Sequence, residues 1–206
     1  MRWLILSAFE PEMAPLRPLL GGAGNVAFVP VGVGLVDAAI GADRALDDHP
    51  FTAVIFVGTC GAFEESALQI GDVIVSRAAK MISPLAVEGR AAFPDALVRG
   101  VVSDAALAHQ FVAAGCRHAD IATTLAITTH DPSASSIATE ADVEHLETFA
   151  ATRAASLREH PFVAVLGVAN MVGSRGRAEW RENHERVSAI VAEKVAAVIR
   201  AWPEGT

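Results

Sequence analysis

The sequence predicts an α/β fold in which helices cover both faces of one central sheet, a three-layer α/β/α sandwich. Short apolar runs bounded by Gly, Pro or polar residues alternate with Ala-rich stretches that carry apolar residues at helical spacing. The 206 residues suffice for one such domain, and no repeat, low-complexity tract or linker divides them. We therefore expect a single domain over residues 1–206.

The alternation assigns most of the chain to an element. Buried strands are expected where apolar runs are bounded on both sides, at Arg2–Ser7, Val26–Val31, Ala53–Val57, Asp72–Ser76, Ile121–Thr129 and Phe162–Val168. Helices are expected where apolar residues recur three or four positions apart, at Glu10–Leu20, Val36–Asp47, Ser103–Ala114, Ala141–Leu157 and Arg177–Trp202. Met81–Asp95 contains two prolines and is expected to be a long loop or flap.

Composition excludes several classes of protein. The net charge of −8 argues against a nucleic-acid partner, because phosphate contacts need clustered Lys and Arg. The apolar run 162–169 is too short to cross a bilayer. The N-terminal apolar stretch is also too short for a signal peptide, and Glu10 follows it closely. Cys60 and Cys116 form no disulfide or zinc motif, which favours the reducing cytoplasm. Because the net charge disfavours a nucleic-acid partner, small-molecule chemistry is the expected activity.

Glu10 and Glu12 are the first candidates for chemistry. They follow the first expected strand, and ligands of open α/β sheets bind at the carboxyl ends of strands. The alternative is that both glutamates only favour the start of a helix through its dipole. The residue pattern alone leaves both interpretations open.

Two glycine-bearing segments follow later strands. Gly32-Val33-Gly34 can bring backbone N–H groups to an anion or a water, but a tight strand-to-helix turn explains it equally well. Gly58–Ala62 follows an apolar strand, and its small residues would allow a flat ligand to approach the backbone.

The second half of the chain adds an acidic run and an asparagine. Glu144 and Glu147 belong to an acidic run, and a solvated helix face is one explanation of such a run. Asn170 follows the strand Phe162–Val168, where a helix cap or a turn is the simplest role. His130 beside Asp131 could form a catalytic pair, although a loop His next to an Asp is commonly incidental.

Together, the segments Ser7–Glu12, Gly58–Ala62, Glu144–Glu147 and Val168–Asn170 resemble the purine nucleoside phosphorylase and nucleosidase family. The resemblance covers most of the chain. It implies a nucleoside phosphorylase-like fold with a mixed sheet and an enzyme that cleaves an N-glycosidic bond. On this match Glu12 is the general base that activates water. The turn has no arginine for a phosphate, which favours hydrolysis.

The resemblance also assigns substrate contacts. Thr59 would touch the ribose or the attacking water, and Phe63 would lie along the base. Glu147 would accept hydrogen bonds from the ribose hydroxyls, and Asn170 would stabilise the departing purine. An asparagine complements a 6-oxopurine such as hypoxanthine, whereas an aspartic acid suits adenine. The remaining assigned contacts are Cys60, Gly61 and Leu146.

The segment Gly173–Trp180 narrows the resemblance to futalosine hydrolases, the menaquinone-pathway nucleosidases that release hypoxanthine. Their substrate carries an acidic aromatic group on the 5′ side of the ribose. Arg175 or Arg177 could bind that carboxylate, and the alternative is plain surface charge. The resemblance implies no metal or organic cofactor. Family habit and a hydrophobic content of 52% lead us to expect a homodimer.

Some positions depart from the family pattern. Leu166 and Ala169 replace an arginine and a serine, which leaves open a purine- or nucleoside-binding protein with weakened catalysis. Residues 128–133 lack the phenylalanine that stacks on the purine, so Phe63 or Phe149 would have to compensate. The enzymatic alternatives are a purine nucleoside phosphorylase and a methylthioadenosine/S-adenosylhomocysteine nucleosidase-like enzyme.

Overall fold

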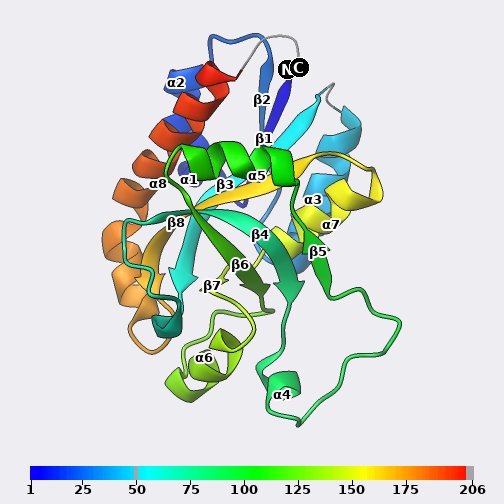
Figure 1. The fold of residues 1–206 in the computed structure, drawn as a ribbon, viewed down its shortest axis with the longest axis vertical. Helices are drawn as coiled ribbons and strands as arrows, with labels where there is room; N and C mark the ends of the chain where they lie inside the picture. The colour runs from blue at the N-terminus through cyan, green and yellow to red at the C-terminus, as the bar shows by residue number, and fades with distance from the viewer. Residues whose placement is uncertain (49–50, 203–206) are drawn as a thin grey trace.

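The computed structural model describes residues 1–48 and 51–202, so residues 49–50 and 203–206 of the expected domain lie outside the described part. The described residues contain one sheet of eight strands (Figure 1). The strands are β1 Trp3–Ser7, β2 Val26–Pro30, β3 Ala53–Ala62, β4 Val73–Met81, β5 Gly100–Val102, β6 Arg117–Thr123, β7 Val143–Glu144 and β8 Phe162–Met171.

The sheet is mixed, as predicted. β1 pairs in parallel with β2 and β3, and β3 pairs in parallel with β8. β4 pairs in parallel with β6 and antiparallel with β8 and β5. The short β7 joins β6 to β3, so β3, β8, β4, β6 and β7 form a closed circuit of pairings. The parallel set β1, β2, β3 and β8 brings four carboxyl ends to one edge, where ligands of such sheets bind.

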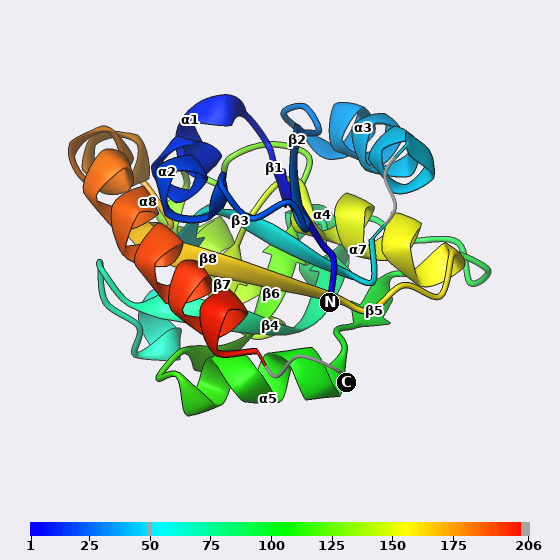
Figure 2. The same ribbon diagram turned by 90° about the horizontal axis from the view of Figure 1, so that it is seen from above.

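Helices cover both faces of this sheet (Figure 2). They are α1 Glu10–Met13, α2 Arg17–Leu20, α3 Leu35–Asp48, α4 Pro84–Val87, α5 Ala105–Ala113, α6 Asp131–Ala138, α7 Thr148–Leu157 and α8 Gly176–Ala201, with short 3₁₀ turns η1 at Ala14–Leu16 and η2 at Glu64–Ser66. Figure 2 shows α3 with α7 on one side of the sheet and α5 with α8 on the other. The predicted three-layer sandwich is therefore confirmed.

The strands are apolar on both faces because both are covered. Along β1, Leu4 and Leu6 pack in the core beneath α3 and α7, whereas Trp3 and Ile5 pack in the core beneath α8. This alternation follows from the two-residue period of a strand. All four side chains are at most 2% exposed, which makes β1 a rigid support for the turn that carries Glu12.

Several predicted elements have different bounds in the structure. The expected helix Glu10–Leu20 is divided into α1, η1 and α2, since prolines at 11, 15 and 18 remove backbone donors. Met81 ends β4, and the expected flap after it contains the short helix α4.

Two corrections matter for the site. The expected strand Ile121–Thr129 ends at Thr123, because Thr124 and Thr128 turn back to donate hydrogen bonds to Glu144. The expected helix Ala141–Leu157 begins only at Thr148, because Val143 and Glu144 pair with β3 and β6 as strand β7. Strand pairing therefore overrides the local helical pattern, and Glu147 precedes the helix instead of lying on its solvated face.

Within residues 1–48 and 51–202, no helix combines the length and apolar character that crossing a membrane requires.

Candidate active site

A cavity of about 320 Å³ opens at the carboxyl ends of β1, β2, β3 and β8. Its size is in the range that holds a small organic ligand. Residues from both halves of the chain meet in it, namely Ala8, Phe9, Glu12, Val33, Thr59, Cys60, Gly61, Ile127, Glu144, His145, Leu146, Glu147, Asn170, Gly176, Arg177, Trp180 and Arg181.

Glu12 lies in the wall of the cavity and is 5% exposed. Its Oε1 accepts two hydrogen bonds from Thr59, from the backbone N–H at 2.9 Å and from the hydroxyl at 2.7 Å. Its Oε2 receives only a 3.4 Å contact from the Ser7 hydroxyl, which also donates to Phe9 O at 3.0 Å. Oε2 is therefore the oxygen with spare capacity to accept a proton.

Burial raises the pKa of Glu12 to about 7, and the nearby charge of Glu147 acts in the same direction. The Thr59 and Ser7 hydrogen bonds oppose this rise because they stabilise the ionised form. A carboxyl group that is about half ionised near neutral pH is suited to general base catalysis. Glu10, by contrast, points away and forms an exposed two-point ion pair with Arg17 at 2.5 and 2.9 Å.

Glu147 lies immediately before α7 and is 5% exposed. Its Oε1 accepts the Gly34 N–H at 2.7 Å, and its Oε2 lies 3.2 Å from His145 Nδ1. Gly34 has φ of +85°, a backbone conformation that favours glycine. The glycine turn after β2 thus binds an anion supplied by the protein itself, the Glu147 carboxylate, and holds it at the cavity.

Asn170 reaches the cavity through an irregularity in β8. The pairing register shifts between Cys60 and Gly61, so that Ala169 is an extra residue opposite them. Bulges of this kind re-aim a side chain. A Cβ at Gly61 would approach Asn170 Nδ2 to 2.8 Å, and one at Gly176 would approach it to 3.0 Å, so both glycines make room for the amide. Asn170 Nδ2 donates to Met171 O at 2.8 Å, which leaves its carbonyl oxygen and one amide hydrogen for a ligand.

Glu144 is a third buried carboxylate at the cavity, 7% exposed. It accepts hydrogen bonds from Thr124 Oγ1 at 2.9 Å, Thr128 Oγ1 at 2.5 Å and Thr128 N at 3.1 Å. Burial raises the pKa of Glu144, and these hydrogen bonds oppose the rise. The carboxylate thereby fixes the loop that brings Ile127 to the cavity.

Other sequence-predicted contacts also lie in the cavity wall. Cys60 and Gly61 of β3 and Leu146 before α7 line it. Burial raises the pKa of the Cys60 thiol, and the charge of Glu12 adds to this, so Cys60 presents a neutral, weakly polar group. His145 also lines the cavity, and burial lowers its pKa against the opposing effect of Glu147.

Phe63 and Arg175 do not lie where the sequence placed them. Phe63 is 1% exposed and packs with Ile82, Ile137 and other apolar residues in a separate core cluster, because β3 ends before it and turns it away from the cavity. Phe149 packs in another cluster and does not line the cavity either. Neither can stack on a bound base; the aromatic side chains that line the cavity are instead Phe9, His145 and Trp180.

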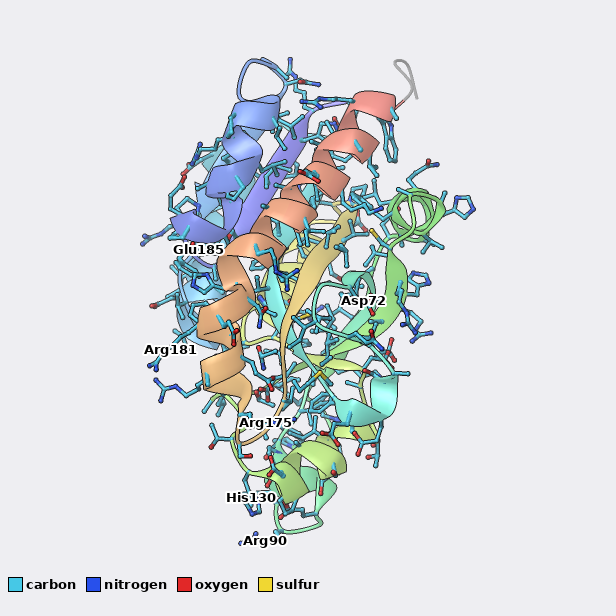
Figure 3. All side chains as sticks on the ribbon, turned by 90° about the vertical axis from the view of Figure 1, so that its left-hand side faces the viewer. Asp72, Arg90, His130, Arg175, Arg181 and Glu185 are labelled. Carbon is cyan, nitrogen blue, oxygen red and sulfur yellow. The ribbon has the colours of Figure 1, made fainter. Side chains whose placement is uncertain are left out.

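Arg175 precedes α8 and points to solvent, with Nε 3.5 Å from Glu179 Oε1 (Figure 3). The arginines that line the cavity are Arg177 and Arg181, one helical turn apart on α8 and both exposed at the rim. The helical period turns residue 175 away from the side that faces the cavity. Among the described residues, neither Arg177 nor Arg181 has a carboxylate partner within salt-bridge distance.

His130 and Asp131 do not form a catalytic pair at the cavity. Asp131 accepts hydrogen bonds from Ser174 N at 2.7 Å and Ser174 Oγ at 3.0 Å, and so anchors the turn before α8. His130 contacts Ser133 Oγ at 3.1 Å and lies beside α6, away from the cavity (Figure 3). Leu166 is fully buried in the core beneath α3 and α7, so it removes no polar group from the cavity wall.

The sequence pattern indicates no role for Trp180 beyond its place in the Gly173–Trp180 match. The structure places Trp180 in the cavity wall, with its indole N–H donating to Thr59 Oγ1 at 3.0 Å. Phe9 and Ile127 also line the cavity without having been singled out. Phe9 belongs to the matched Ser7–Glu12 segment, and that match could have identified it as a lining residue. Ile127 belongs to none of the matched segments.

The family model for the Phosphorylase superfamily matches residues 17–202, which is most of the chain. The chain belongs to the Phosphorylase superfamily. The resemblance noted in the sequence is thus confirmed at the level of the superfamily. A comparison with curated proteins gave no match.

Several solved structures share the fold over nearly the whole chain. A mutant futalosine hydrolase of Helicobacter pylori strain 26695 has a TM-score of 0.86 at 13% identity, over 98% of this chain and 100% of that one. The 5′-methylthioadenosine/S-adenosylhomocysteine nucleosidase of Neisseria meningitidis, in complex with methylthio-immucillin-A, has a TM-score of 0.86 at 19% identity, over 98% and 99%. The corresponding nucleosidase of Colwellia psychrerythraea 34H, in complex with adenine, has a TM-score of 0.82 at 20% identity, over 97% and 95%. At these identities the likeness concerns the fold.

Proposed function

We propose that the protein is a purine nucleosidase that hydrolyses the N-glycosidic bond of a 6-oxopurine nucleoside, with futalosine as the favoured substrate. The observation that carries the proposal is the meeting of Glu12, Glu147 and Asn170 in one cavity. These residues come from three distant segments and supply a base, a ribose acceptor and a leaving-group partner.

In the proposed reaction, Glu12 Oε2 takes a proton from water, and the water oxygen attacks C1′ of the ribose. The bond from C1′ to N9 breaks, and its electron pair leaves with the purine, which takes a proton from solvent water at N7, while the proton on Glu12 is later returned to solvent. Glycosidic cleavage passes through a positively charged, oxocarbenium-like sugar. The carboxylates of Glu12 and Glu147 near the sugar would stabilise that charge.

Hydrolysis is favoured over phosphorolysis by the charges at the cavity. The cationic side chains that line it among the described residues are Arg177 and Arg181, both at the rim on α8. The surroundings of Glu12 are a backbone N–H and neutral hydroxyls, which suit a water better than a phosphate dianion. The same two arginines support an acidic substituent on the substrate, as futalosine carries on the 5′ side of its ribose.

The proposal is tested by measuring base release from futalosine, inosine and methylthioadenosine, with and without phosphate. We expect hypoxanthine from futalosine at a rate independent of phosphate, and slower release from inosine, which lacks the acidic substituent. A strict requirement for phosphate would identify a phosphorylase instead. Tight binding of these nucleosides without turnover would favour the non-enzymatic alternative.

Asn170 leads to a prediction about base choice. A 6-oxopurine protonated at N7 can donate to the Asn170 carbonyl and accept its remaining amide hydrogen at O6, whereas adenine presents a donor at C6. An unpaired buried polar group costs roughly 1–3 kcal/mol, so we expect about a 5- to 150-fold preference for hypoxanthine nucleosides. Asn170→Asp should shift the ratio of kcat/KM values toward adenine nucleosides. Asn183→Asp, on α8 outside the cavity lining, is the control. Faster cleavage of adenine nucleosides by the unmodified protein would contradict this role.

We also propose a homodimer. The apolar side chains of Val33, Val36 and Ile40 are 60%, 67% and 49% exposed and share one side of α3 and the turn before it. Leu125 and Ile127, in the loop held by Glu144, are 83% and 53% exposed. Val33 and Ile127 both line the cavity, so these apolar residues border its mouth.

Light scattering at micromolar concentration is therefore expected to give about 43 kDa, twice the chain mass of 21.5 kDa. Val36→Asp should lower the mass toward that of one chain, because it places a charge in the apolar surface. Val112→Asp, on α5 at the opposite side of the sheet, should leave the dimer intact. A mass of 21.5 kDa for the unmodified protein would refute the dimer.

A further inference from the structure

Thr59 connects two side chains that lie on either side of it. Its hydroxyl donates to Glu12 Oε1 at 2.7 Å and accepts the Trp180 indole N–H at 3.0 Å. Thr59 belongs to β3, Glu12 to the turn after β1, and Trp180 to the second turn of α8. Three elements that are distant in the sequence thus form one chain of hydrogen bonds that ends on the proposed base.

The direction of this chain follows from the chemistry of indole. The Trp180 nitrogen can only donate, so the Thr59 oxygen must use a lone pair toward it. A hydroxyl has a single hydrogen. Because the Trp180 N–H donates to the Thr59 oxygen, this hydrogen must point away from the indole, toward Glu12. Linked hydrogen bonds of this kind also polarise one another, which strengthens the bond on the carboxylate.

We propose that Trp180 is a positioning residue for the base. It fixes the Thr59 hydroxyl so that this hydroxyl keeps donating its hydrogen bond to Glu12 Oε1, while Oε2 remains free to accept a proton from water. The proposal rests on the proposed function only where it identifies the proton donor to Glu12 as the water that attacks the nucleoside. It also revises the expected role of Thr59, which can accept a hydrogen bond from a ribose hydroxyl but has no proton left to donate to one.

The position of Trp180 is itself supported. Its ring stacks on His184 of α8 with centroids 4.1 Å apart and planes 13° apart. The stacking partner lies one helical turn further along, so the indole is held without using its N–H. The titratable groups that share the cavity with Glu12 are Cys60 of β3, Glu144 of β7, His145 and Glu147 before α7, and Arg177 and Arg181 of α8. None of these is altered by a substitution at Trp180.

The test removes the indole N–H while keeping an aromatic ring. In Trp180→Phe the Thr59 proton is no longer directed, the hydrogen bond to Glu12 weakens, and the Glu12 pKa should rise by about 0.5 to 1 unit. The ¹³C chemical shifts of the Glu side-chain carboxyls report this titration, with Glu12 assigned by its absence in Glu12→Gln. This measurement requires no turnover, so it is informative even if the protein hydrolyses no nucleoside.

A second pair of variants separates positioning from general damage. Thr59→Val removes the intermediate hydroxyl, and adding Trp180→Phe to it should shift the Glu12 pKa no further, because the effect of Trp180 passes through Thr59. His184→Ala removes the stacking partner but keeps the indole N–H, so the Glu12 pKa should shift less than in Trp180→Phe.

If the nucleosidase activity is present, the ratio of kcat/KM of the unmodified protein to that of Trp180→Phe should be about 3- to 10-fold larger at pH 6 than on the plateau above pH 9. An unmoved Glu12 titration in Trp180→Phe, or an equal shift with and without the Thr59 hydroxyl, would overturn the proposal.

Discussion

Replacement of Glu12 by Gln is expected to lower turnover by about 10²–10⁴-fold, the usual contribution of a positioned general base. Gln keeps the size of the side chain and can still accept the two Thr59 hydrogen bonds, but it cannot take a proton from water. The measurement is hypoxanthine release from futalosine in single-turnover and steady-state assays. Glu10→Gln is the matched control, because Glu10 lies on the same turn and only forms the exposed ion pair with Arg17. Wild-type-like turnover in Glu12→Gln would remove Glu12 from the mechanism.

The unmodified enzyme should show the corresponding pH dependence. The base acts only when ionised, and the pKa of Glu12 is raised to about 7. Therefore kcat/KM should rise as the pH increases through about 7 and level off above it. An acidic limb centred near the ordinary value of 4.5 would show that Glu12 is more solvated during catalysis than the structure implies.

The same variant tests the burial of Glu12 through stability. Its pKa is about 7 in the folded protein and ordinarily 4.5, so between these values the folded state holds a proton that the unfolded state has lost. The free energy of unfolding of the unmodified protein should therefore fall as the pH rises through that window. Glu12→Gln has no carboxyl group to titrate at this position, so this contribution to the pH dependence is absent. Urea unfolding should show it gaining stability relative to the unmodified protein between pH 5 and pH 8, by about 3 kcal/mol at most.

Glu147→Ala carries the second large expected effect. A carboxylate that accepts from both vicinal ribose hydroxyls contributes roughly 1.5–3 kcal/mol per hydrogen bond, so kcat/KM for a ribonucleoside should fall by about 10²–10⁴-fold. A 2′-deoxy substrate already lacks one of these bonds and should lose only about 10- to 150-fold. The measurement is the ratio of kcat/KM values for inosine and 2′-deoxyinosine in both proteins.

The control for this variant is Glu140→Ala, an exposed residue of the same acidic run. It should leave both substrates unaffected, since its side chain contacts nothing at the cavity. Because Glu147 also accepts the Gly34 N–H, the loss of Glu147 can loosen the turn after β2. Equal losses for ribo and deoxy substrates would mean that Glu147 acts through this turn and does not read the 2′-hydroxyl.

The amino-acid sequence determined the layers of the fold and several residues of the cavity wall. The central strands carry continuous apolar runs because both of their faces are covered, and such runs are visible without a structure. The rule that ligands bind at the carboxyl ends of strands pointed to Glu12, whereas the family resemblance assigned Thr59 and Asn170.

Tertiary structure decided the parts that depend on distant pairing. Residues 141–147 have a helical pattern, but strand pairing of Val143 and Glu144 takes priority and places Glu147 against the Gly34 N–H. The extra residue in β8 that aims Asn170 is visible only in its register with β3. The rotation of α8 decided that Arg177 faces the cavity while Arg175 does not, and that Trp180 reaches Thr59, 121 positions away. These features arise from contacts between segments far apart in the chain, and a single sequence records no such contacts.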